Sequence, residues 1–111
     1  MTLVLDINHW LDEHGELPMD NPRLYRKALR MVRFIEYGGP IQPLEGLLTL
    51  VECRKRPGGK SCLGLMWVTK QNDERIRAHC FTCHDVEVVI SGWQGSLWAD
   101  GVPTALPMTD D

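Results

Sequence analysis

The 111 residues suffice for one domain with a modest hydrophobic core and are too few for two independent cores. With 43% hydrophobic and 24% charged residues the composition is that of a globular chain, and no apolar run approaches the roughly 18 residues of a membrane span. The net charge of −3 conceals an uneven distribution, because all twelve Lys and Arg residues lie between Arg23 and Arg77 and both ends are acidic.

The N-terminus shows no sign of a secretory signal. Its apolar stretch has no basic residue before it, and Asp6 cuts it short. We therefore expect a cytoplasmic protein without membrane association. In that reducing compartment thiols stay reduced, and paired cysteines are more often metal ligands or redox groups than disulfides.

A short helix is expected over residues 6–14. Asp6 can cap its first turn, and Gly15 follows its last residue. The apolar residues between these two ends share one face, which would pack against the rest of the domain.

A second and longer helix is expected over residues 21–37. Asn21 can cap it, Pro22 takes the favoured first position, and a Gly-Gly-Pro sequence at residues 38–40 ends it. One face is apolar, and the opposite face is basic over an arc of about 120°. The basic stripe consists of Arg23, Arg26, Lys27, Arg30 and Arg33.

After a linker at residues 38–46 the pattern changes to short segments rich in Val, Leu, Ile and Trp, separated by turn signals. Such segments predict three or four antiparallel strands in a meander. The expected strands span residues 47–55, 62–70, 75–80 and 86–93. Trp67 alternates with Leu65 in the second of them and is expected to point into the core.

These elements predict a single α+β domain, with two N-terminal helices packed on a small antiparallel, zinc-ribbon-like sheet. The helical part would span residues 1–40 and the metal-stabilised β part residues 47–98. Residues 101–111, with two prolines and two terminal Asp residues, are expected to be a frayed tail.

Four cysteines fall near the ends of the expected strands. Cys80 and Cys83 have two residues between them, a spacing that lets both sulfurs reach one tetrahedral ion. Cys53 and Cys62 flank a Pro-Gly-Gly turn, and the next hairpin would return this pair toward the second. The sequence therefore predicts one structural site made by four thiolates, with zinc as the expected metal and iron as an open alternative.

In these two pairs the chain resembles a zinc ribbon, in which cysteine pairs at the ends of β-hairpins hold one zinc ion. The resemblance covers roughly residues 51–93. It departs from the usual Cys-Pro-x-Cys-Gly knuckle, because His84 stands where the glycine would be and the first pair carries an eight-residue insert. The resemblance implies a structural ion with no open coordination position.

The cysteine pattern leaves other arrangements open. His79 or His84, which flank the second pair, could replace one cysteine as a ligand. A redox pair at Cys80 and Cys83 is disfavoured, because redox Cys-x-x-Cys motifs open a helix and the residues after Cys83 have a strand pattern. Disulfides and unpaired thiols are the remaining alternatives.

Two basic clusters and one aromatic segment are candidate contact surfaces. One cluster is the helix stripe, and the other lies on the hairpin over the metal site, where zinc ribbons often present a contact surface. Trp93 and Gln94, flanked by glycines, would offer a stacking platform, although a Trp that caps the end of the sheet is the commoner arrangement. The hairpin cluster consists of Arg54, Lys55, Arg56 and Lys60.

These features predict a small zinc-stabilised binding or adaptor protein, with nucleic acid as a candidate partner for the basic helix face and the basic hairpin. The alternative is a protein–protein interaction module without nucleic acid. Charged helix faces are also often simply solvated, and the acidic first twenty residues could fold across this one. No general acid–base pair or activated nucleophile has a supporting context, so we do not expect an enzyme.

Overall fold

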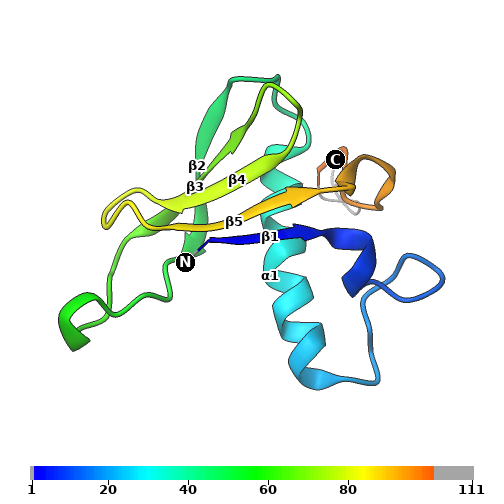
Figure 1. The fold of residues 1–111 in the computed structure, drawn as a ribbon, viewed down its shortest axis with the longest axis horizontal. Helices are drawn as coiled ribbons and strands as arrows, with labels where there is room; N and C mark the ends of the chain where they lie inside the picture. Colours follow the sequence, from blue (N-terminus) through cyan, green and yellow to red (C-terminus); the bar gives the residue numbers. More distant parts are fainter. Residues whose placement is uncertain (1, 102–111) are drawn as a thin grey trace, which may run out of the picture.

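The computed structural model describes residues 2–101, in which one long helix packs on one face of a five-stranded sheet (Figure 1). The expected tail lies almost entirely outside these residues. The strands are β1 (Leu3–Asp6), β2 (Gly46–Glu52), β3 (Leu65–Lys70), β4 (Ile76–Cys80) and β5 (Val86–Ser91). The helix is α1 (Pro22–Gly38), and short 3₁₀ turns lie at η1 (Ile7–Trp10), η2 (Pro57–Gly59) and η3 (Trp93–Gly95).

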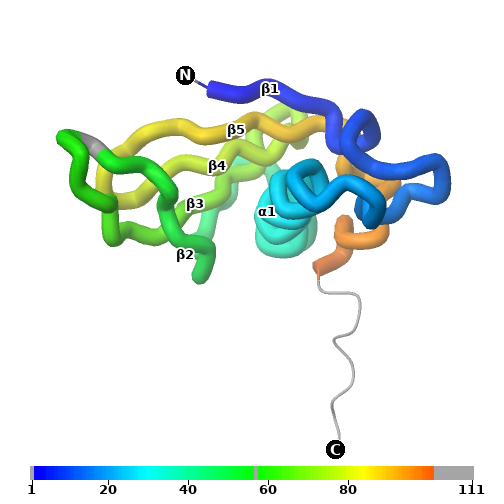
Figure 2. Tube along the Cα trace, turned by 90° about the horizontal axis from the view of Figure 1, so that it is seen from below, coloured from blue at the N-terminus to red at the C-terminus, as the bar shows by residue number. Residues whose placement is uncertain are grey.

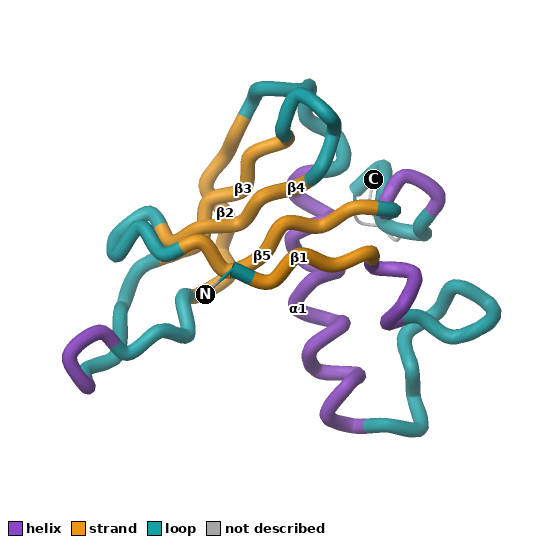
Figure 3. Tube along the Cα trace, viewed as in Figure 1, coloured by secondary structure: helices purple, strands orange, loops and turns teal. Residues whose placement is uncertain are grey.

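The sheet is mixed, with the strand order β1-β5-β4-β3-β2 (Figure 3). The strands from β2 to β5 form the expected antiparallel meander. β1 adds to the outer edge of β5 in parallel, with Leu3 opposite Val88 and Leu5 opposite Ile90. The first strand of the chain therefore pairs with the last, and β1 forms one edge of the sheet.

The expected first helix is wrong. Residues 3–6 form β1, and only one 3₁₀ turn follows, in which the Asp6 carboxylate accepts a hydrogen bond from the Asn8 N–H at 2.9 Å. A helix of nine residues is too short to be stable without tertiary packing. Pairing with β5 satisfies the backbone groups of this segment and buries Leu5 and Ile7.

The long helix forms where the sequence predicts it. The Asn21 side chain accepts a hydrogen bond from the Leu24 N–H at 3.2 Å, and the Gly39 N–H bonds to the Ile35 carbonyl at the other end. Its apolar stripe packs on the sheet, which supplies the facing core residues Met66, Val68, Ile76, Ala78, Val88 and Ile90. Among the described residues, no helix is both long and apolar enough to cross a membrane.

The sheet has one covered face and one open face. Figure 2 shows α1 on one side of the sheet, and no helix covers the other side within residues 2–101. Trp67 lies on the open face, because its neighbours Met66 and Val68 are the residues buried on the covered face. It stacks on Phe81 with ring centroids 5.6 Å apart, so the expected core position of Trp67 is wrong.

Candidate metal centre

The topology brings all four cysteines to one end of the sheet. β2 ends there, β3 begins there, β4 ends there and β5 begins there, because these neighbours run antiparallel. Cys53 directly follows β2, and Cys62 lies three residues before β3. Cys80 is the last residue of β4, and Cys83 lies in the turn to β5. The predicted convergence of the two pairs is therefore present.

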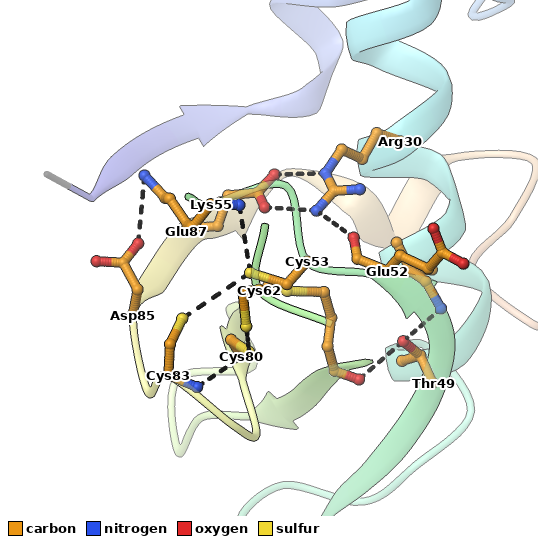
Figure 4. A network of polar contacts seen from close by, with 12 residues as sticks. Arg30, Thr49, Glu52, Cys53, Lys55, Cys62, Cys80, Cys83, Asp85 and Glu87 are labelled. Carbon is orange, nitrogen blue, oxygen red and sulfur yellow. Dashed lines mark hydrogen bonds and ion pairs between the residues drawn. The ribbon is translucent and has the colours of Figure 1, made fainter. Parts of the chain in front are cut away.

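The four side chains point toward one another (Figure 4), and their sulfur atoms all lie within 4.8 Å of one another. The Sγ atoms of Cys53 and Cys83 are 3.9 Å apart, and those of Cys62 and Cys80 are 3.6 Å apart. Zinc with Zn–S bonds of about 2.3 Å requires S–S edges of about 3.8 Å in a tetrahedron. A disulfide would need about 2.05 Å, and all four thiols are free. The cluster fits one tetrahedral ion.

Backbone N–H groups face the sulfurs. The N–H groups of Thr82 and Cys83 both lie 3.3 Å from Cys80 Sγ, and the Lys55 N–H lies 3.4 Å from Cys53 Sγ. Burial raises the pKa of Cys80, but these two N–H groups and the Cys62 thiol outweigh it, which brings this pKa down to about 7. Burial dominates at Cys53 and raises its pKa to about 12. A bound cation would favour the thiolate form of all four.

The Cys80–Cys83 knuckle forms without the usual glycine. His84 takes the left-handed backbone conformation that a glycine would adopt, with φ of 64°. The turn is closed by hydrogen bonds from the His84 N–H to the Cys80 carbonyl and from the Cys80 N–H to the Asp85 carbonyl, both 2.9 Å long. The turn therefore forms without the usual glycine because His84 accepts a strained backbone conformation.

Sequence reasoning missed Gly64, which lies against the centre. A Cβ at this position would clash with the Thr82 side chain and would come within 2.9 Å of Cys80 Sγ. Gly64 lies two residues after Cys62 in the sequence, and its carbonyl accepts a hydrogen bond from the Cys53 N–H at 3.0 Å. The signal in the sequence is a glycine close behind a cysteine, typical of a backbone that must approach a metal site.

The histidines stay outside the cluster. Within residues 2–101, the group of side chains close enough to share an ion consists of the four cysteines alone. His79 is partly buried, and burial, Arg77 and His84 lower its pKa. The structure therefore offers no support for a histidine that replaces a cysteine.

Arg30 links the helix to the metal end of the sheet. Its Nε and Nη2 atoms donate to the two carboxylate oxygens of Glu87, both at 2.7 Å, and Nη2 also donates to the Glu52 carbonyl at 3.0 Å (Figure 4). Glu87 lies where the β4–β5 register shifts, and this irregularity directs its side chain toward the helix. Arg30 is 7% exposed, so it is not part of the basic surface that the sequence predicted.

The other predicted basic residues are exposed. Arg23, Arg26, Lys27 and Arg33 lie on α1, and Arg54, Lys55, Arg56 and Lys60 lie in the loop between β2 and β3. Arg26, Arg33 and Arg54 line one groove between the helix and the end of β2. The structure therefore brings part of the helix stripe and part of the hairpin cluster together.

Trp93 is a core residue and offers no stacking face. It is 4% exposed, its Nε1–H donates to the Glu74 carbonyl at 2.7 Å, and the Lys70 ammonium lies 4.6 Å from its ring centroid. Lys70 in turn donates to the Gly39 carbonyl at 2.7 Å, which ties the end of the helix to the sheet. Gln94 is exposed beside it, but the platform that the sequence suggested is absent.

No protein-family model, curated protein or solved structure matches the chain. The zinc-ribbon resemblance therefore rests on the cysteine cluster and its place at the ends of two hairpins. Any functional conclusion has to be drawn from the geometry of this chain.

Proposed function

We propose that this protein is a small binding module, organised by one structural zinc ion, that contacts nucleic acid through its basic surface. The observation that carries the proposal is the cluster of four sulfurs within 4.8 Å of one another. Four thiolates complete a tetrahedral coordination shell, so the ion has no open position for substrate or water. We therefore assign it a stabilising role and no catalytic one.

A structural metal also suits the size of the domain. The helix covers only one face of the sheet, and the loop of residues 53–64 contains a single 3₁₀ turn as regular structure. A structural zinc contributes on the order of 10 kcal/mol to folding, which is comparable with the whole net stability of a typical domain. Free thiolates at this site also suit a reducing, cytoplasmic environment.

The direct test is elemental analysis of protein purified without chelator, together with a count of reactive thiols. We expect one zinc per chain, and thiols that react quickly only after a chelator is added. Iron in place of zinc would change the metal but keep the site. Four freely reactive thiols without metal, or two disulfides, would contradict the proposal.

The nucleic-acid part of the proposal rests on the exposed cations. Within residues 2–101, none of the acids among the first twenty residues forms a direct ion pair with an arginine of α1. A binder of phosphates should lose affinity steeply as salt rises. A protein–protein interaction module, the alternative, would bind no oligonucleotide even at low salt.

A further inference from the structure

The groove between α1 and the end of β2 combines charge with an apolar wall. It has a volume of about 480 Å³, within the range of small-ligand sites. The helix contributes Arg26, Arg33 and Tyr37, whereas Leu50 and Arg54 come from β2 and the residues that follow it. Two elements that are distant in sequence therefore build one concave surface.

Three of the four arginines that line the groove form no ion pair within the described chain. The ion pairs among residues 2–101 join Arg30 to Glu87, Lys55 to Asp85 and Arg75 to Asp73, and none of them involves Arg26, Arg33 or Arg54. Glu52 is the one acid among the described residues that line the groove. Guanidinium groups with no internal partner are available to bind phosphate oxygens in pairs.

The apolar part of the groove is held in place. The Leu50 N–H donates to the Tyr37 hydroxyl at 3.3 Å, which fixes the aromatic ring beside the strand. Leu50 itself is 80% exposed, so its side chain is accessible to a ligand that enters the groove. Cations beside an aromatic and an aliphatic surface are the combination with which proteins bind unpaired bases and their phosphates.

Arg30 shapes the groove without offering its charge to a ligand. Its guanidinium is satisfied by Glu87 and by the Glu52 carbonyl, so it holds the end of β2 against the helix. Cys53 also lines the groove, directly before Arg54, and a metal ion at the cysteine cluster would fix this wall.

We infer that this groove is a binding site for single-stranded nucleic acid, in which Arg26, Arg33 and Arg54 pair with phosphates and a base lies against Tyr37 and Leu50. The inference rests on the proposed function, because it assigns the proposed nucleic-acid binding to this groove. Arg26 and Arg33 are seven residues apart, about 10.5 Å along the helix, so they reach different phosphates. The exposed Arg23 and Lys27 extend the positive surface beyond the groove, which favours a polymer over a single nucleotide.

The test is fluorescence anisotropy with zinc-loaded protein and a labelled single strand of about 12 nucleotides, poly(dT) or poly(rU), compared with a duplex of the same length. Arg33→Gln and Arg54→Gln should each weaken binding about three- to tenfold and reduce the slope of log affinity against log salt by about 0.7. Arg75→Gln removes the same charge at a residue paired with Asp73 outside the groove, and it should leave both quantities unchanged.

A second pair of variants separates stacking from charge. Tyr37→Leu should weaken binding about tenfold without changing the salt slope, whereas Tyr37→Phe keeps the ring, loses only the hydroxyl that accepts from the Leu50 N–H, and should weaken binding about twofold. Zinc content and thermal unfolding of each variant would show that the fold is retained.

The possible results separate the two proposals. If Arg33→Gln and Arg75→Gln weaken oligonucleotide binding equally, the inference about the groove is wrong. The same holds if the duplex binds as tightly as the single strand. Either result would leave a basic surface that binds nucleic acid outside the groove. No binding at the lowest salt by zinc-loaded protein would overturn both nucleic-acid proposals and leave the metal centre standing.

Discussion

His84, like Leu44 and Glu74, has a positive φ that its side chain disfavours, and of the three it is the one next to a cysteine of the cluster. Its φ of 64° lies in the left-handed region, which costs an L-residue about 1–2 kcal/mol and glycine almost nothing. The turn it completes carries Cys83, so this strain sits inside the metal site. We expect the free energy of unfolding of His84→Gly to be about 1 kcal/mol greater than that of His84→Ala, measured by urea unfolding of the zinc-loaded proteins. In a right-handed turn the order would be reversed, because glycine then has the greater entropic cost.

Gly64 shows the opposite kind of constraint, in which space rather than dihedral angle requires glycine. A Cβ there would collide with Thr82 and press on Cys80 Sγ. We expect Gly64→Ala to weaken zinc binding and to lower the melting temperature, measured by chelator competition and calorimetry. Gly95→Ala is the matched control, because nothing lies within 4 Å of a Cβ at that position. Equal behaviour of the two variants would show that the backbone does not approach the centre this closely.

Between elements, the ion pair of Arg30 and Glu87 joins α1 to β5 beside the metal centre. Both of its hydrogen bonds are 2.7 Å long, and the guanidinium also lies 5.3 Å from the Phe34 ring centroid. Removing one partner of such a pair leaves the other charge uncompensated, and because Glu87 is 22% exposed we expect a cost of about 2 kcal/mol, below that of a fully buried pair. We expect that loss for Arg30→Met in urea unfolding, and a smaller one for Arg30→Met combined with Glu87→Leu. A double variant as unstable as the single one would refute this explanation.

The elements that the sequence predicts correctly are those with local signals. α1 carries its own cap at Asn21, its own Pro22 and its own glycine terminator, and the cysteine pairs carry their own spacing and turns. β1 forms because it pairs with β5, more than eighty residues later in the sequence. The residues of β1 alone carry no pattern that predicts this pairing. The burial of Arg30 likewise depends on Glu87, 57 residues away, so its place on a helical wheel could not reveal it.

Over the whole molecule, the metal end of the sheet and the basic groove share a wall. Cys53 lies in the cluster and lines the groove, and Arg54 follows it. The core between α1 and the sheet is continuous with the centre, because Cys53 and Cys80 belong to the same buried cluster as Ile76 and Ile90, which pair across β4 and β5 at its far end. The loop of residues 53–64, by contrast, has few backbone hydrogen bonds of its own, among them those from Cys62 to Lys55 and from Gly59 to Arg56.

Removal of the metal should therefore act on stability and on binding together. Because a structural zinc contributes on the order of 10 kcal/mol, the metal-free chain should be close to or beyond its unfolding midpoint at room temperature. We expect a chelator to abolish the near-ultraviolet circular dichroism of the tryptophans and to remove oligonucleotide binding, and added zinc to restore both. Cys53→Ser should reproduce the chelated state in the presence of zinc. A chelated protein with an unchanged melting temperature would show that the four thiols do not hold a structural ion, because loss of such an ion removes folding energy directly.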